Sequence, residues 1–95
     1  MYCEMCGRRI ATCKHHLVFG NGLRQLADKD NLCLTLCDNC HNMGKVTERI
    51  HDNPAAERLS KMLGQAIYER NMCERGMSID ESRESFRKRY GKSYL

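Results

Sequence analysis

The hydrophobic positions of the chain follow different patterns in its two halves. In the first half, short β-prone runs occur at residues 10–19 and 32–36, and the glycines of residues 20–22 predict a turn after the first run. Residues 23–27, between the two runs, predict a single helical turn. From Pro54 onward the apolar residues recur at helical spacing instead. The pattern therefore predicts an α+β fold with its strands in the first half and its long helices in the second.

The ends of two helices are marked in the second half. Asn53 is a good N-cap and Pro54 fits the first helical position, so a helix is predicted from here to about residue 75. Ser78 and Glu81 match a capping box and predict a second helix that ends near residue 90. The apolar positions of the first helix predict one buried stripe, made of Leu59, Met62, Leu63, Ala66, Ile67 and Cys73.

A shorter helix is predicted directly after the second strand. Asp38 is a favourable N-cap for it. Gly44 interrupts the pattern, and residues 47–51 are expected to resume the helix.

The length and charge of the chain narrow its class. Its 95 residues predict one structural domain, with residues 1–52 as a small module and residues 53–95 as a helical extension packed on it. A chain of this size buries little apolar surface, so a zinc staple is expected. The net charge of +4 favours a polyanionic partner, although a slightly basic protein without such a partner fits the charge equally well.

Four of the seven cysteines form two CxxC pairs, Cys3 with Cys6 and Cys37 with Cys40. This spacing is typical of a structural site for Zn²⁺, and Gly7 supplies the positive φ that the first turn needs. The odd number of cysteines, with no signal peptide or membrane-spanning run, favours metal-binding thiolates over disulfides and a cytoplasmic location without membrane contact. The remaining cysteines are assigned to packing, with metal ligation as the alternative for Cys13.

The sequence between and beside the cysteine pairs resembles the zinc-stapled HNH nucleases, also called ββα-metal nucleases. The matching motifs, in order, are Cys3xxCys6, His15-His16, Asn31-Leu32 and Leu36-Cys37xxCys40-His41. The resemblance covers about residues 1–51. It implies a treble-clef zinc module, to which the hydrophobic pattern adds the two C-terminal helices, and a DNA endonuclease that hydrolyses phosphodiester bonds. Small proteins of this kind are typical of phages and prophages, which implies the cytosol of a bacterial host.

The resemblance also implies a role for each polar residue of the motif. His16 would be the general base, and Asn31 would hold it in place. His15 and His41 would bind a catalytic Mg²⁺, and imidazole ligands would also accept Mn²⁺ or Ni²⁺. His51 is either a further metal or phosphate contact or a surface histidine. Adjacent strand residues face opposite sides, so His15 and His16 need a twisted or bulged strand to act at one point.

The expected partner is DNA, and its phosphates would be contacted by Arg8, Arg9, Arg24 and Lys45. The basic helix near the C-terminus is either a solvated face or a further contact with the nucleic acid backbone. The helix of residues 54–75 is also a possible homodimer interface. The competing function is a non-catalytic zinc-binding treble-clef module that binds nucleic acid or a protein. The histidines distinguish the two functions, because a binding module does not need a second, histidine-rich site.

Overall fold

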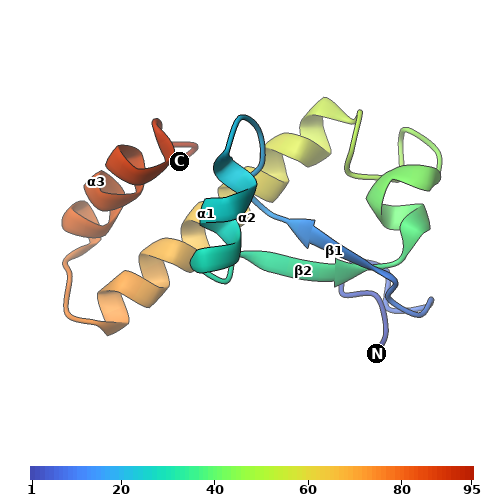
Figure 1. Cartoon of the computed structure of the whole chain (residues 1–95), viewed down its shortest axis with the longest axis horizontal. Coiled ribbons are helices and arrows are strands. Elements are labelled where there is room, and N and C mark those ends of the chain that lie inside the picture. The colour runs from blue at the N-terminus through green and yellow to red at the C-terminus, as the bar shows by residue number, and fades with distance from the viewer.

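The computed structural model describes residues 1–95, and its fold is α+β, as predicted. The elements in chain order are β1 (Cys13–His16), α1 (Leu23–Lys29), β2 (Cys33–Leu36), the π-helical turn η1 (Asn39–Met43), α2 (Pro54–Glu74) and α3 (Ile79–Tyr90). Figure 1 shows the N-terminal segment and the loop after β2 at one end of an elongated molecule, and α3 with the C-terminus at the other. The long helix α2 connects the two ends.

The two strands form one antiparallel sheet. His16 is the register partner of Cys33, and Cys13 is the partner of Leu36. The N-terminal turn is attached to this sheet, because Glu4 donates its backbone N–H to the carbonyl of Thr35 at 2.9 Å and accepts the N–H of Thr35 on its carboxylate at 2.7 Å. The first strand is shorter than the predicted residues 10–19, and only an isolated bridge from Tyr2 to Ile10 precedes it.

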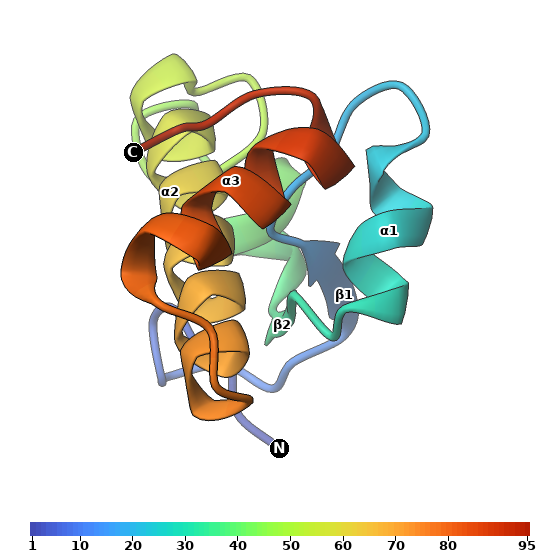
Figure 2. The same cartoon turned by 90° about the vertical axis from the view of Figure 1, so that its left-hand side faces the viewer.

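The connection between the strands contains more helix than the predicted single turn. Helix α1 has seven residues and starts after Gly22, which adopts φ 76°. Figure 2 shows α1 beside β1, on the opposite side from α2.

The helix predicted at Asp38 is a single π-helical turn, and the side chain of Asp38 does not cap it. The N–H of Gly44 closes this turn on the carbonyl of Asn39 at 3.0 Å. The prediction that residues 47–51 resume the helix is wrong, because they form turns. Arg49 holds this loop instead, donating to the carbonyls of Gly44 and His51 at 3.0 and 2.8 Å.

The predicted ends of the two long helices are confirmed. The side chain of Asn53 accepts the N–H of Ala56, and Pro54 is the first residue of α2. At α3, Ser78 and Glu81 form the complete capping box. Both signals are local in sequence, which explains why they could be recognised there.

The predicted buried stripe of α2 is mostly wrong: none of its residues is fully buried, although Ile67 packs against the larger hydrophobic cluster. Leu59 and Leu63 are 64% and 44% exposed, and the buried residues are Ser60, Gly64, Gln65, Tyr68 and Glu69. Ser60 and Gly64 are needed where the chain leaving β1 passes close to the helix: Ser60 donates to the carbonyl of Leu17, and a Cβ at Gly64 would lie 2.7 Å from Val18 Cγ2. The homodimer through residues 54–75 stays a prediction.

Two hydrophobic clusters divide the interior. The larger joins the exit of β1 and α1 to α2 and α3, and contains Leu17, Val18, Ala27, Leu32, Tyr68, Phe86 and Tyr90. The smaller surrounds the cysteine pairs and contains Cys3, Leu36, Cys37, Cys40 and Ile50. The first cluster therefore packs residues of the helical half directly against the strand half. None of the helices has both the length and the apolar composition needed to cross a bilayer.

Candidate metal centres

The four cysteines of the CxxC pairs converge on one point between the N-terminal turn and the end of β2. Their sulfur atoms all lie within 4.8 Å of one another, and Cys6 Sγ is 4.0 Å from Cys37 Sγ. Sulfurs bound tetrahedrally to one Zn²⁺ at about 2.3 Å lie about 3.8 Å apart, so the spacing fits this ion. All seven cysteines are free thiols. The cluster could therefore hold a metal ion such as zinc.

Backbone N–H groups favour the thiolate form within this cluster. Burial raises the pKa of Cys3, but hydrogen bonds from the backbone of Cys6, Cys37 and Met5 outweigh it and lower the pKa to about 6. The N–H of Met5 is 3.4 Å from Cys3 Sγ. The turn thus presents a ready anionic ligand, as metal binding by sulfur requires.

The pKa values of Cys6 and Cys40 shift in opposite directions. Backbone hydrogen bonds from Arg8 and Arg9 lower the pKa of Cys6. Burial and the neighbouring thiols raise the pKa of Cys40. A bound cation would remove this repulsion between the thiolates, so the arrangement favours metal occupancy.

A second cluster joins three histidines from separate parts of the chain. His15 lies in β1, His41 in η1 and His51 in the loop before α2, and one ring nitrogen of each lies within 4.8 Å of the others. The ring centroids of His41 and His51 are 4.6 Å apart, and each is 5.2 to 5.3 Å from His15. We call this set the three-histidine cluster.

The backbone explains how His51 reaches His41 across ten residues. Ile50 donates its N–H to the carbonyl of Cys40 at 2.9 Å, and His51 donates its N–H to the carbonyl of His41 at 3.1 Å. The loop between them folds back on η1, so the interruption at Gly44 brings the two imidazoles together.

A hydrogen-bond chain fixes the tautomer of His15. Its Nε2 is 2.8 Å from Ser60 Oγ, and the Ser60 hydroxyl donates to the carbonyl of Leu17 at 2.9 Å. Because the hydroxyl has only one hydrogen, Nε2 must donate to Ser60, which leaves Nδ1 unprotonated with a free lone pair. Burial, followed by the charges of His51 and His41, lowers the pKa of His15 to about 3. His15 is therefore a neutral imidazole held in one position, with a nitrogen lone pair that a metal ion could accept.

The other two imidazoles face each other through their Nε2 atoms, 3.0 Å apart. Two nitrogens bound to one ion at a right angle, each about 2.1 Å from it, also lie about 3.0 Å apart. Burial, followed by the charges of His51 and Arg24, lowers the pKa of His41. The Glu57 carboxylate lies 3.7 Å from Nδ1 of His51. The cluster has the donor atoms and spacing for a divalent cation.

His16 has different partners from His15, as the alternation of a strand predicts. Its Nε2 lies 3.0 Å from Asp28 Oδ1 in α1, and the same oxygen accepts Lys14 Nζ at 2.6 Å. Hydrogen bonds from Lys14 and His16 lower the pKa of Asp28 to about 2, so it is an anion that can only accept. In the neutral form of His16, Nε2 therefore carries the hydrogen and Nδ1 has the lone pair. The charge of His16 also lowers the pKa of His15 and His41, which indicates that it lies near the three-histidine cluster.

Asp28, rather than Asn31, makes the hydrogen bond to the His16 ring. Asn31 is exposed with φ 58°, and its backbone N–H donates to the carbonyl of Asp28 at 3.2 Å. Its position is that of a turn residue after α1. Asp28 was not predicted as this partner, because α1 was expected to end before residue 28 and instead continues to Lys29.

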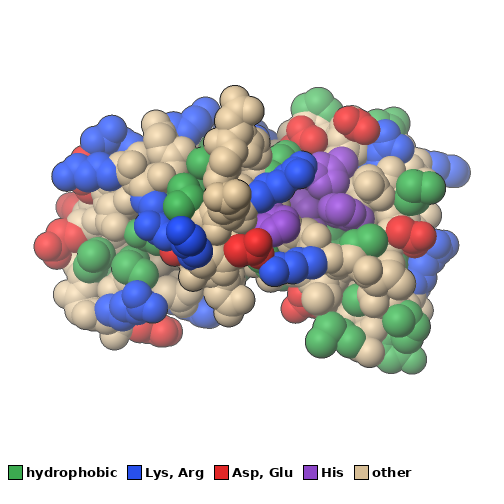
Figure 3. All heavy atoms as spheres, in the orientation of Figure 1, with side chains coloured by type: hydrophobic (Ala, Val, Ile, Leu, Met, Phe, Trp, Pro, Cys, Tyr) green, Lys and Arg blue, Asp and Glu red, His purple; other side chains and the backbone are tan.

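The predicted phosphate contacts lie in different places. Arg24 is close enough for its charge to lower the pKa of His15 and His41. Arg8 and Arg9 are exposed and line a hollow of about 680 Å³ beside Cys6 and Cys40. Lys45 is exposed in the loop after η1. Figure 3 shows histidine side chains gathered in a patch on one face, with Lys and Arg side chains beside them.

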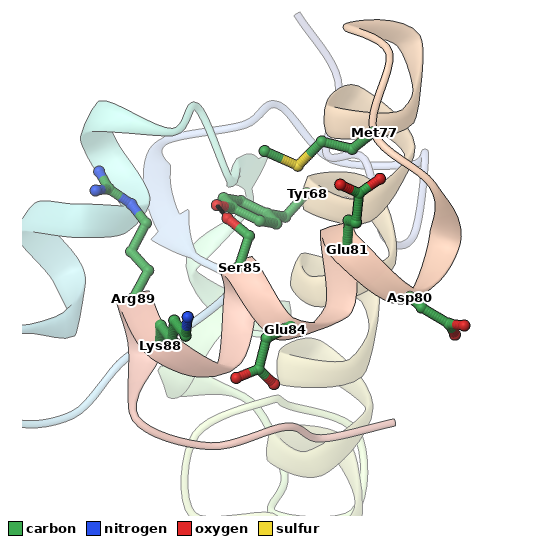
Figure 4. Close-up of a pocket in the computed structure, with 8 residues that line it drawn as sticks. All are labelled: Tyr68, Met77, Asp80, Glu81, Glu84, Ser85, Lys88 and Arg89. Carbon is green, nitrogen blue, oxygen red and sulfur yellow. Dashed lines mark hydrogen bonds between the residues drawn. The ribbon is translucent and has the colours of Figure 1, made fainter.

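A separate hollow of about 790 Å³ lies against α3 (Figure 4). Three acidic side chains, Asp80, Glu81 and Glu84, line it together with Lys88 and Arg89. The hydroxyls of Tyr68 and Ser85 meet there at 2.7 Å. It contains no histidine or cysteine and is not part of either metal cluster.

Comparison with known proteins assigns no relative to this chain: no protein-family model, curated protein or solved structure matches it.

Proposed function

We propose that this chain is a metal-dependent endonuclease of the HNH, or ββα-metal, type, built on a treble-clef zinc module, and that it hydrolyses DNA phosphodiester bonds to 5′-phosphate and 3′-hydroxyl ends. One observation carries the proposal: three imidazoles with the spacing of a cation site lie near a fourth histidine that is held by a carboxylate. A module that only binds a partner has no use for this second, histidine-rich site.

The three-histidine cluster would hold the catalytic ion, which could be Mg²⁺, Mn²⁺ or Ni²⁺. Neutral imidazoles suit Mn²⁺ and Ni²⁺ better than Mg²⁺. When bound, such an ion supplies positive charge that polarises the phosphodiester and neutralises the leaving 3′-oxygen. Ser60 keeps the lone pair of His15 Nδ1 free for the ion by accepting the hydrogen of Nε2.

His16 would act as the general base. Because Nε2 donates to Asp28, the lone pair of Nδ1 is free to accept the proton of the attacking water. The Asp28 carboxylate would then stabilise the imidazolium that forms, since it accepts a hydrogen bond from the ring that has gained a positive charge. Asp28 is thus a positioning residue, and takes over the role that the resemblance gave to Asn31.

The basic residues would bind the DNA backbone. Arg24 is the best candidate for a contact with the scissile phosphate, because its charge acts on the three-histidine cluster and it takes part in none of the ion pairs of the structure. Arg8, Arg9 and Lys45 would extend the contact away from the scissile phosphate. Contacts of this kind give affinity without sequence reading and weaken as salt is raised.

The test is plasmid cleavage by the zinc-loaded protein with Mg²⁺, Mn²⁺ or Ni²⁺. We expect His16→Ala to lower the cleavage rate by at least about 100-fold, the lower range for a general base. Gln25→Ala, an exposed change on α1, is the matched control and should cleave as the wild type does. Zinc content and circular dichroism verify that each variant is folded.

Two outcomes would contradict the proposal. Equal cleavage by wild type and His16→Ala would remove His16 from the mechanism. Absence of cleavage with all three ions, in a folded protein that contains zinc, would favour the non-catalytic binding module.

A further inference from the structure

A third group of metal-binding side chains lies around His16, outside the two clusters described above. His16 of β1 and Cys33 of β2 are register partners, so their side chains emerge on the same face of the sheet. Asp28 reaches them from α1, with Oδ1 at 3.0 Å from His16 Nε2 and 3.6 Å from Cys33 Sγ. One donor atom of each residue lies within 4.8 Å of the other two.

The chemistry of these donors is that of a site for a borderline transition ion. One imidazole, one thiol and one carboxylate are all ligands of Zn²⁺, and three protein ligands leave a fourth position open. The group already attracts a cation, because the Lys14 ammonium lies 2.6 Å from Asp28 Oδ1. The Lys14 side chain is 59% exposed, so it can turn into solvent when a metal takes its place.

We propose that His16, Asp28 and Cys33 form a second zinc site, and that Zn²⁺ bound there switches off the nuclease by occupying the general base. Zn²⁺ would replace the hydrogen on His16 Nε2, and a neutral imidazole bound through Nε2 carries its hydrogen on Nδ1. The Nδ1 lone pair that would accept the proton of water is then lost. The Cys33 thiol gives up its proton to solvent as it binds, so one proton is released for each Zn²⁺ taken up.

The binding half of this proposal is independent of the proposed function, and only the inhibition rests on it. Binding is tested by titrating the full-length, zinc-loaded protein with Co²⁺, which binds thiolates more weakly than Zn²⁺ and so leaves the four-cysteine site loaded. A cobalt–thiolate charge-transfer band in the near ultraviolet reports on Cys33, because the three-histidine cluster contains no sulfur. Zinc retained after the titration is measured by atomic absorption.

We expect the band in the wild type and its loss in Cys33→Ser. Cys13→Ser is the matched control, because Cys13 is a half-buried strand cysteine outside the group, and it should keep the band. Asp28→Ala provides a second disruption of the site should Cys33→Ser fold poorly, and it should weaken the band. Absence of a thiolate band in the wild type, or its persistence in Cys33→Ser, would overturn the site.

Inhibition is tested by plasmid cleavage in Mg²⁺ with rising free Zn²⁺. Loss of a residue that only supports a metal ligand weakens metal binding by about 10-fold or more. Because Cys33 would bind the ion directly, the zinc concentration for half inhibition should rise by more than about 10-fold in Cys33→Ser. Equal inhibition of Cys33→Ser and wild type would overturn the switch. If no variant cleaves DNA, the proposed function fails, while the Co²⁺ titration still decides whether the site exists.

Discussion

Replacing Ser60 with alanine tests the assignment of His15 as a metal ligand. The Ser60 hydroxyl accepts from His15 Nε2 at 2.8 Å and donates to the carbonyl of Leu17 at 2.9 Å, and the residue is only 6% exposed. Ser60→Ala leaves both partners buried without their hydrogen bond. It also removes the only contact that decides which nitrogen of His15 carries the hydrogen, so part of the population can present a protonated Nδ1 to the ion.

The structure sets the size of both effects. Each unsatisfied buried group costs about 1 to 3 kcal/mol, so the free energy of unfolding should fall by about 2 kcal/mol or more. Loss of a hydrogen-bond partner behind a ligating histidine typically weakens metal binding about 10- to 100-fold. We therefore expect the dissociation constant for Ni²⁺ to rise by that factor, while the four-cysteine site keeps its zinc.

The assay is isothermal titration calorimetry of the zinc-loaded protein with Ni²⁺, in a Cys33→Ser background that removes the proposed second zinc site. Ser82→Ala is the matched control: Ser82 is fully buried in α3 and its hydroxyl donates to the carbonyl of Ile79 at 2.7 Å. It should lower stability without changing the affinity for Ni²⁺. Unchanged affinity in Ser60→Ala, or an equal loss in both variants, would refute the reasoning that His15 is a ligand oriented by Ser60.

Other changes test the scaffold. Cys37→Ser, or removal of zinc by a chelator, should unfold the first half of the chain because structural zinc contributes folding energy directly, as circular dichroism would show. Gly64→Ala should lower the melting temperature, because its Cβ would lie 2.7 Å from Val18 Cγ2 and overpacking costs about 1 to 3 kcal/mol. This cost should exceed the gain of about 1 kcal/mol that alanine gives in a helix, so a rise in melting temperature would contradict the close packing. Ser78→Ala should cost about 1 kcal/mol and leave Ni²⁺ binding unchanged. The pKa of His15 is lowered to about 3 in the fold, so the unfolded chain takes up the proton first as pH falls. With no metal in the three-histidine cluster, the free energy of unfolding should therefore decrease as pH falls below about 6.5. Denaturation midpoints that stay flat over this range would contradict this prediction.

The parts of the fold that could be predicted from sequence depend on neighbouring residues. The caps at Asn53 and Ser78 and the positive φ of Gly7 each involve a few consecutive positions, and the structure has all three. The convergence of the two CxxC pairs was also predictable. Each pair supplies only two ligands, so a tetrahedral zinc site with four cysteines requires the two pairs to lie side by side.

The features that sequence reasoning missed depend on contacts between distant segments. The buried face of α2 is set by where the chain leaving β1 touches it, and there the small residues Ser60 and Gly64 are needed rather than leucines. His51 joins His41 through backbone hydrogen bonds across a loop, which no periodicity encodes. A histidine ten residues beyond His41 could be named as a possible ligand but not positioned.

The adjacent histidines of β1 show how strand geometry separates two chemical roles. Alternation directs His15 inward, where it is 1% exposed and meets Ser60, and gives His16 the exposed carboxylate of Asp28 as its partner. Burial makes His15 a poor base, since its pKa is lowered to about 3, but leaves it a neutral ligand at every physiological pH. His16 keeps contact with solvent, which a group that must accept a proton and release it again requires. The same strand thus supplies one imidazole suited to binding a cation and another suited to proton transfer, and exchanging their environments would disable both.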